Sequence, residues 1–427
     1  MQIKRMGSLA IIVIVIFILF LLVTMINLQD VNAKLEGKGK DDKLEVETSP
    51  AREWFRIWGT EGNDVAVDQN DNCYLVGSIA NDAFIVKFDA NGNEIWNRTW
   101  GGAEDDEAYG LVIDSNTNSC YLIGATESFG VSLVDGFIVK YDLNGTQLWN
   151  LTWGGPNTDA GVDVTVDSFG NCYAGGLINK SGDLTGDAIL LKYDSDGNQL
   201  WNRTYGGAEL DDTGGIDLDS GNNCYIAGTT SSFGTDHYDL FIVKYNQTGT
   251  QLWNRTYDYD AWERCFGMAI DGLNNCYLVG DPGLLKYDSE GNQLWHQTLD
   301  ILEYPLATAI AIDTENNCYV TGHTWVYDIF RTIYSAFVLK LDSSGNALGH
   351  RLIYDDALYW GNGIAVDESN NFYVAGEIRV YAVDAFLFKS STLYPLQVSG
   401  FEWLFFLIGG QLLGLLLLEW KYMKGKK

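Results

Sequence analysis

The sequence is poor in proline, histidine and basic residues. Its 427 residues include 5 prolines, 4 histidines and 27 lysines and arginines, against 57 aspartates and glutamates, for a formal net charge of −30 at pH 7. A chain this acidic lacks the basic footprint that nucleic acids and anionic lipid surfaces require. Few prolines beside 47 glycines favour tight turns over long helices. The scattered histidines and the lack of a C-x-x-C pair argue against a zinc site.

An apolar run lies at each end of the chain. Residues 9–26 follow Lys4 and Arg5, and the triplet Val31-Asn32-Ala33 offers a cleavage site. We expect residues 1–33 to be a signal peptide, with an uncleaved signal anchor as the alternative. Residues 401–420 are almost wholly apolar and precede a basic tail at 421–427. This pattern predicts a transmembrane helix with a cytoplasmic tail rather than a buried core helix.

The stretch between these runs is therefore expected outside the cell, tethered to the cell membrane at its C-terminus. Polar linkers are predicted at 34–53 and 392–400, and a repeat region fills 54–391. A segment similar to FIVKYD recurs seven times there, with its lysine at Lys87, Lys140, Lys192, Lys244, Lys286, Lys340 and Lys389. Three other segments keep step with it: one that ends in aspartate, one that resembles NCYLVG and one that resembles WNRTWGG.

Each segment has the length and composition of a β-strand. The segments are rich in β-branched and aromatic residues and are bounded by Gly, Asn and Asp, which are turn formers. Four short antiparallel strands repeated about every 50 residues indicate a β-propeller blade. The region begins with a lone tryptophan segment at Trp54–Trp58 and ends with a third strand at Phe386–Lys389. We therefore predict an all-β, seven-bladed propeller closed by its N-terminal outer strand, which removes the open sheet edge.

The repeat resembles a known family. The run WGGAEDDEAYGLVIDSNTNSCYLIGATES (100–128), followed by DGFIVKYD and TQLWNLTWGG, is similar to the seven-bladed β-propeller repeat often labelled SBBP, over the whole of 54–391. That family is largely of unassigned function and occurs in exported, surface-attached prokaryotic proteins. The resemblance implies an archaeal or bacterial cell-surface protein. The chain departs from the family pattern in the cysteine before tyrosine and in its short fifth unit.

The cysteines follow the repeat. Six of the seven occupy one position in successive blades: Cys73, Cys120, Cys172, Cys224, Cys276 and Cys318. In the seventh blade, Phe372 takes that position. A position shared with phenylalanine is expected to be buried, and equivalent sites on adjacent blades are too far apart to bridge. We predict free buried thiols rather than disulfides. Cys265, on a first strand, has no obvious partner.

The repeated lysine and tryptophan have structural interpretations. A ring of lysines could line a binding site, but we expect each aliphatic stem to pack between blades while its ammonium reaches a carboxylate or carbonyl. We expect Trp149 and its equivalents to lie on the same face as Phe137 and Tyr141 and to pack in the core.

Acidic residues gather in the connections that follow the tryptophan segments. Aspartates recur six residues after the aromatic residue that ends or follows the segment, at Asp64, Asp106, Asp159 and Asp211, with Glu104, Asp105, Glu107 and Asp212 nearby. Convergent carboxylates could hold Ca²⁺, or each could cap its own turn. No other cofactor is predicted. The second-to-third strand connections on the same face carry apolar side chains, including Trp325, Tyr327 and Phe330, and are candidate partner-binding loops.

Seven N-x-S/T sequons mark glycosylation candidates, although repeat drift alone could produce several of them: Asn97, Asn144, Asn150, Asn179, Asn202, Asn246 and Asn254.

Location and motifs favour a non-enzymatic binding module for an extracellular protein or glycan. The sequence contains no G-x-S-x-G elbow, H-E-x-x-H helix or phosphate loop. The alternatives are a propeller enzyme, either quinone-dependent or sugar-processing, and a structural surface-layer component. The string KYDSDGNQLW (192–201) is similar to the repeat of pyrroloquinoline-quinone propellers. Those usually have eight blades, and many have adjacent cysteines, which this chain lacks.

Overall fold

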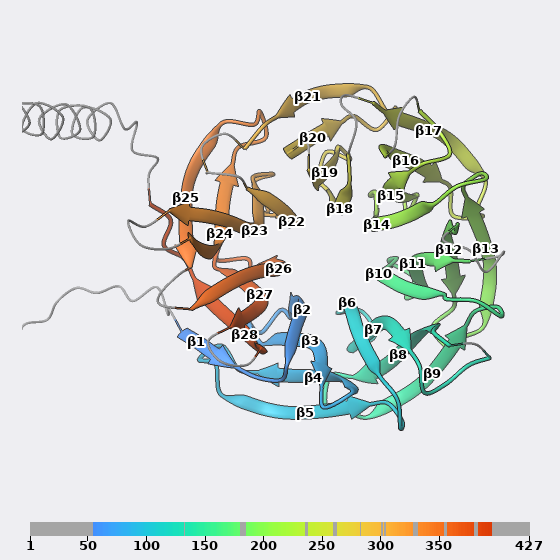
Figure 1. Ribbon diagram of the computed structural model, residues 1–427, viewed down its shortest axis with the longest axis horizontal. Helices are drawn as coiled ribbons and strands as arrows, with labels where there is room; N and C mark the ends of the chain where they lie inside the picture. Colours follow the sequence, from blue (N-terminus) through green and yellow to red (C-terminus); the bar gives the residue numbers. More distant parts are fainter. Residues whose placement is uncertain are drawn as a thin grey trace, which may run out of the picture. The chain divides into compact units, whose positions relative to one another are not determined.

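The computed structural model describes residues 54–131, 133–179, 185–234, 238–258, 263–281, 283–299, 302, 305–327, 332–353, 357–379 and 383–394. These residues form seven four-stranded sheets arranged as the blades of a propeller (Figure 1). The predicted signal segment, N-terminal linker and transmembrane helix lie outside these ranges. Within them, no helix is long and apolar enough to cross a membrane.

Each blade runs from an inner strand near the axis to an outer strand at the rim. Blades 1 to 3 are built from β2 (Glu61–Val67), β3 (Cys73–Ile79), β4 (Asp82–Phe88) and β5 (Glu94–Trp100); β6 (Asp106–Asp114), β7 (Ser119–Thr126), β8 (Asp135–Asp142) and β9 (Gln147–Trp153); and β10 (Ala160–Val166), β11 (Cys172–Ile178), β12 (Asp187–Tyr193) and β13 (Gln199–Tyr205). Blades 4 and 5 contain β14 (Asp211–Leu218), β15 (Cys224–Thr230), β16 (Asp239–Tyr245) and β17 (Gln251–Tyr257), then β18 (Cys265–Ile270), β19 (Cys276–Gly280), β20 (Gly283–Tyr287) and β21 (Gln293–Gln297).

The last two blades differ in how they are completed. Blade 6 contains β22 (Leu306–Ile312), β23 (Cys318–Tyr327), β24 (Thr332–Leu341) and β25 (Ala347–Ile353). Blade 7 contains β26 (Leu358–Val366), β27 (Phe372–Arg379) and β28 (Val383–Ser390), and its outer strand is β1 (Trp54–Ile57). Trp54 pairs with Lys389 and Ile57 with Phe386. The predicted seven blades and their closure by the N-terminal strand are confirmed.

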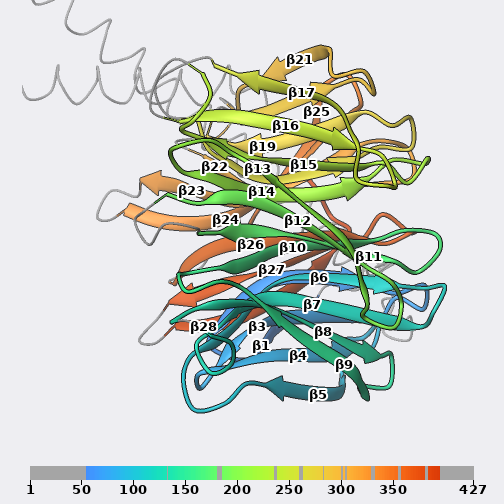
Figure 2. The same ribbon diagram turned by 90° about the vertical axis from the view of Figure 1, so that its right-hand side faces the viewer.

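The ring has two loop-bearing faces (Figure 2). The connections from second to third strands and from one blade to the next lie on one face, which we call the loop face. The turns between first and second strands and the hairpins between third and fourth strands lie on the other, which we call the turn face. The two sets separate because the four strands of each blade are antiparallel.

The core lies between neighbouring blades. Seven clusters of buried side chains join residues of adjacent sheets, and the second-strand tyrosines and third-strand phenylalanines are among the largest buried groups. The six repeated cysteines are free and buried, as predicted, and Phe372 is equally buried at the equivalent position. Cys265 is also free and buried. Burial raises the pKa of Cys73 and Cys120 to about 12, so these thiols are inert packing groups.

The prediction that the repeated tryptophan shares a sheet face with Phe137 and Tyr141 was wrong. Trp149 pairs with Lys140, and its ring lies 5.7 Å from that of Tyr121, on the face opposite Phe137 and Tyr141. A bulge between Lys140 and Tyr141 shifts the register of the hairpin by one residue. The tryptophan still packs against the neighbouring blade, because its indole N–H donates to the Ser195 carbonyl at 3.1 Å.

Candidate functional site

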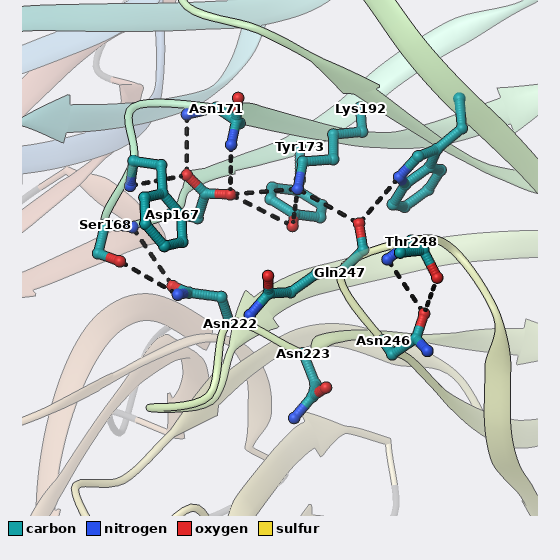
Figure 3. A network of polar contacts seen from close by, with 12 residues as sticks. Asp167, Ser168, Asn171, Tyr173, Lys192, Asn222, Asn223, Asn246, Gln247 and Thr248 are labelled. Carbon is teal, nitrogen blue, oxygen red and sulfur yellow. Dashed lines mark hydrogen bonds and ion pairs between the residues drawn. The ribbon is translucent and has the colours of Figure 1, made fainter.

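The repeated lysine forms a buried network in each blade, best seen in blade 3 (Figure 3). The Lys192 ammonium lies 3.2 Å from Asp167 and 2.6 Å from the Tyr173 hydroxyl, and 4.5 Å from the centre of that ring. It also donates to the Gln247 carbonyl of blade 4 at 3.4 Å. Asp167 further accepts bonds from the amides of its own turn, including Asn171. The lysine therefore ties two strands and the next blade together, as the structural interpretation predicted.

Blade 2 departs from this pattern. Ion pairs join the lysine and aspartate in the other six blades, at 3.0 to 3.9 Å. In blade 2, Asp114 instead accepts the Thr117 hydroxyl at 2.5 Å, and Lys140 donates to the Ser195 carbonyl at 3.0 Å. Desolvation lowers the pKa of Lys140, with the Asp114 charge only partly opposing it.

Three of the four aspartates that were candidate metal ligands build the loop face. Asp106 accepts the Gly102 N–H at 2.8 Å, the Ser128 hydroxyl at 2.7 Å and the Thr126 hydroxyl. Asp211 makes the same set with Gly207, Thr230 and Ser232. Asp159 accepts the N–H groups of Gly155 and Asn179. Each buried carboxylate thus fastens the incoming connection of its blade to the loop that follows the second strand.

A side chain at the first glycine of the WGG step would clash with two carboxylates. A Cβ added at Gly154 would lie 2.0 Å from Oδ1 of Asp135 and 2.7 Å from Oδ2 of Asp159, which belong to adjacent blades. The same convergence of two carboxylates surrounds Gly101 and Gly206. Desolvation, with the Asp135 charge as a smaller cause, raises the pKa of Asp159. In the described part of the chain, no group of three or more acidic, cysteine or histidine side chains has metal-binding geometry. The Ca²⁺ site stays a prediction.

Asp64 does not belong with the other three. In each blade an aspartate follows or ends the first strand, Asp68 in blade 1 and Asp114 in blade 2. Asp64 lies four residues before Asp68, whereas Asp106 lies eight residues before Asp114. The connection from β1 into β2 is shorter than those between later blades. A residue six positions after the aromatic residue that ends or follows the tryptophan segment therefore lies further along the inner strand in blade 1 than in blades 2 to 4. Asp64 instead lines the central channel.

The channel is a cavity of about 560 Å³ among the inner strands, and three carboxylates line it: Asp64, Asp163 and Asp217. Their pKa values are raised to about 8, 6 and 7, respectively, chiefly because the surrounding protein desolvates them. The Asp163 charge adds to the rise for Asp64 and Asp217. The channel therefore holds three carboxyl groups whose pKa values lie near neutral pH.

These carboxylates also join the blades. Oδ2 of Asp64 accepts the Leu111 N–H of blade 2 at 2.9 Å. Oδ2 of Asp163 accepts the Ile216 N–H of blade 4, and Oδ2 of Asp217 accepts the Ile270 N–H of blade 5, both at 2.8 Å. An inner strand has no neighbouring strand at the axis, so these bonds satisfy part of its free edge.

Two further hollows lie between the channel and the loop face. A groove of about 720 Å³ between blades 2, 3 and 4, here the loop-face groove, is lined by Leu133, Pro156, Leu177, Glu209, Leu210, Tyr238 and neighbouring residues. A pocket of about 340 Å³, here the connecting pocket, shares Leu210 and Tyr238 with the groove. It shares Val162, Gly214 and Phe266 with the channel. The three hollows are therefore neighbours that share lining residues, and we refer to them together as the route.

The lining of this route is apolar and acidic. Its described charged residues are Glu209 in the groove, Asp212 and Arg264 in the connecting pocket, and the three channel aspartates. Burial raises the pKa of Asp212 to about 6. The Arg264 guanidinium lies 5.2 Å from the centre of the Tyr238 ring. Leu133, which lines the groove, is 83% exposed.

The remaining candidate loop residues lie in different places. Glu104 and Asp105 are exposed on the loop face, and Glu107 accepts the Asn63 amide at 2.8 Å. Trp325 was expected in a loop but lies in β23, where it pairs with Tyr334 of β24. The position of Tyr327 is likewise in β23, because these two strands continue beyond the blade as an extended ladder. Phe330 lies outside the described residues.

Sequence reasoning placed Asp64 among the loop carboxylates and missed Asp163 and Asp217. The signal for Asp163 was a charged residue within an inner strand otherwise made of small and apolar residues, AGVDVTV. The groove could not be found from one segment, since its lining comes from connections of three blades.

No protein-family model and no curated protein matches the chain. Solved structures match it. A streptogramin B lyase structure aligns with a TM-score of 0.53 and 12% identity, covering 78% of this chain and 97% of that one. A catalytically inactive virginiamycin B lyase from Staphylococcus aureus with quinupristin aligns with a TM-score of 0.51 and 13% identity, covering 79% and 99%. At these identities the likeness shows the propeller fold alone.

Proposed function

We propose that this chain is a membrane-tethered extracellular propeller of the SBBP type that binds a protein partner through its loop face. The export and tether rest on the apolar runs at 9–26 and 401–420 and the lysines after the second run. The observation that carries the binding function is the row of neighbouring hollows formed by the loop-face groove, the connecting pocket and the channel. Ligand sites are typically concave and mostly apolar with a few placed polar groups, and this route has that character.

The chemistry of the lining indicates the kind of segment that would bind. Leu133, Leu177 and Leu210 offer contacts to apolar side chains, and Glu209 and Asp212 lie along the same route. Lysine or arginine side chains of a partner would be attracted toward the channel carboxylates. An extended peptide segment with apolar and basic residues fits this surface better than a glycan, because the described groove lining offers one aromatic ring, that of Tyr238.

A peptide-display selection on the full chain in lipid nanodiscs tests this function. We expect enrichment of sequences that combine aliphatic residues with lysine or arginine. Leu133→Lys in the groove should weaken a selected peptide at least tenfold, about 1.4 kcal/mol. Phe169→Lys is the matched control, because Phe169 is 71% exposed in a turn-face turn. Equal losses in both variants, or a glycan-array signal sensitive to Leu133→Lys, would contradict the peptide-binding proposal.

One observation favours a second candidate, a propeller enzyme. Carboxyl groups with pKa values of about 6 to 8 in a channel can act as general acids or bases at neutral pH. A screen of ester, lactone and glycoside substrates tests it. Turnover that is lost in Asp163→Asn and Asp217→Asn would support an enzyme, and no turnover in any class would set it aside.

A further inference from the structure

The rim of the propeller carries a regular belt of exposed aliphatic side chains. One residue at the same position in the outer strand of six blades is 50% to 53% exposed: Ile95, Leu148, Leu200, Leu252, Leu294 and Leu348. Water-facing aliphatic side chains at a repeated position leave apolar area uncovered, which costs free energy and favours aggregation.

In blades 1 to 4 each belt residue is followed, on the same strand face, by a complete sequon. Successive side chains of a strand alternate, so positions i, i+2 and i+4 share a face. Ile95, Asn97 and Thr99 therefore point the same way, and all three are exposed. The other three blades of this set repeat the triplet at 148, 150 and 152, at 200, 202 and 204, and at 252, 254 and 256.

The opposite face of the same strands is occupied by packing. The Trp96 indole donates to the Leu143 carbonyl at 3.1 Å, and the Arg98 guanidinium donates to the Gly145 carbonyl at 2.7 Å. Both contacts reach the hairpin of the next blade. The outer strand thus has one face committed to its neighbour and one face that displays an aliphatic residue, an asparagine amide and a threonine hydroxyl to solvent.

Blades 5 to 7 have no sequon on their outer strands, and the chain leaves the propeller beside one of them, blade 6. Tyr394 pairs with His350 at the edge of β25, with N–H···O distances of 2.8 and 2.9 Å in the two directions. The Arg351 guanidinium lies 5.5 Å from the centre of the Tyr394 ring. Only six residues lie between Tyr394 and the start of the predicted span at 401, and seven Cα–Cα steps reach about 25 Å at most. The predicted span would therefore begin within about 25 Å of blade 6.

Blades 1 to 4 lie across the ring from blade 6. In Figure 1, β5, β9, β13 and β17 follow the lower and right rim, while β25 lies at the left. A domain of about 340 residues has a radius of gyration of roughly 20 Å, so the far rim is roughly 50 Å from blade 6. The four sequon-bearing strands therefore lie on the part of the rim that is farthest from the point where the chain leaves the propeller.

We propose that Asn97, Asn150, Asn202 and Asn254 carry N-linked glycans that cover the aliphatic belt on the rim across the ring from the point where the chain leaves the propeller. In the transfer, the asparagine Nδ2 forms a bond with the anomeric carbon of a saccharide. The bond from that carbon to a diphosphate carrier lipid breaks, and one amide proton is lost. The inference rests on the export of the propeller that the proposed function includes.

Glycopeptide mass spectrometry on the full chain from membranes of its own host is the test, after protease treatment of intact cells has shown that the propeller is outside. We expect saccharide on all four asparagines. Unmodified peptides from a surface-accessible protein would overturn the glycan proposal alone. A protease-inaccessible propeller would overturn both the export and the glycans.

Two sets of variants test the shielding role. Asn→Gln at 97, 150, 202 and 254 should remove four glycan masses and increase the fluorescence of a dye that binds apolar surface. Thr→Ala at 99, 152, 204 and 256 should do the same while keeping the asparagines. Adding Ser at 95, 148, 200 and 252 to the Asn→Gln variant should return the dye signal toward that of the native chain. A dye signal that stays at the native level after the glycans are lost would contradict shielding.

Discussion

Replacing Lys192 by methionine tests the account of the repeated lysine most severely. Methionine keeps the apolar stem but removes the ammonium that lies 3.2 Å from Asp167 and 2.6 Å from Tyr173. Asp167 is 2% exposed and would be left as a buried carboxylate without its counter-charge. Removing one partner of a buried ion pair typically costs 3 to 5 kcal/mol. The amide donors that Asp167 keeps, including Asn171, favour the lower end, about 3 kcal/mol.

The assay is thermal unfolding of the full chain in detergent, followed by circular dichroism. An unfolding entropy of about 2.1 cal/mol/K per residue over about 340 residues makes 3 kcal/mol equivalent to a fall in Tm of about 4 °C. The double variant Lys192→Met, Asp167→Asn should recover part of that loss, because no charge is then left unpaired.

Blade 2 supplies the matched control. Asp114 is already engaged by Thr117, and desolvation lowers the pKa of Lys140. Lys140→Met should therefore cost about 1 kcal/mol, close to the value of one hydrogen bond, or about 1.5 °C. Equal falls for Lys140→Met and Lys192→Met, or no recovery in the double variant, would refute the pairing argument.

The remaining predictions concern the loop face and the channel. Gly154→Ala should destabilise the fold by about 1 to 3 kcal/mol, because its Cβ would meet Asp135 at 2.0 Å, whereas Gly155→Ala, whose nearest neighbour is 3.9 Å away, should be close to neutral in urea unfolding. Equal effects would contradict the steric account. Asp64 and Asp217 have folded pKa values of about 8 and 7, above the unfolded value near 3.9, so the folded state binds more protons. Their contribution to stability is therefore fully present below about pH 4 and is lost as pH rises from about 4 to 8, and Tm should fall over that window. The double Asp→Asn variant should flatten the fall, and an unchanged pH profile would contradict it.

The sequence predicted the fold almost completely because its repeats are local. Each strand and turn is specified within about ten residues, and the unpaired segments at the two ends determine the closure that Trp54 and Lys389 make. The buried cysteine position followed from its exchange with Phe372 alone. Errors arose where one residue of register decides the outcome. A hairpin bulge moved Trp149 to the other face, and a shorter first connection moved Asp64 into the channel.

The site was less predictable because it is formed between blades. Asp135 and Asp159 are 24 positions apart and converge over Gly154 only in the closed ring. The channel carboxylates acquire their raised pKa values from surrounding blades, not from neighbours in sequence. The loop-face groove needs three connections at once, so composition could indicate an acidic, apolar face but not its shape.

Hydrogen exchange with a selected peptide bound measures the central claim most directly. If an extended partner segment lies in the groove between blades 2, 3 and 4, amides at 127–134 and 207–212 should exchange more slowly in the complex. Amides of the turn face, such as those near Phe169, should be unaffected. Slower exchange confined to the turn face or to the outer strands would contradict binding through the loop face.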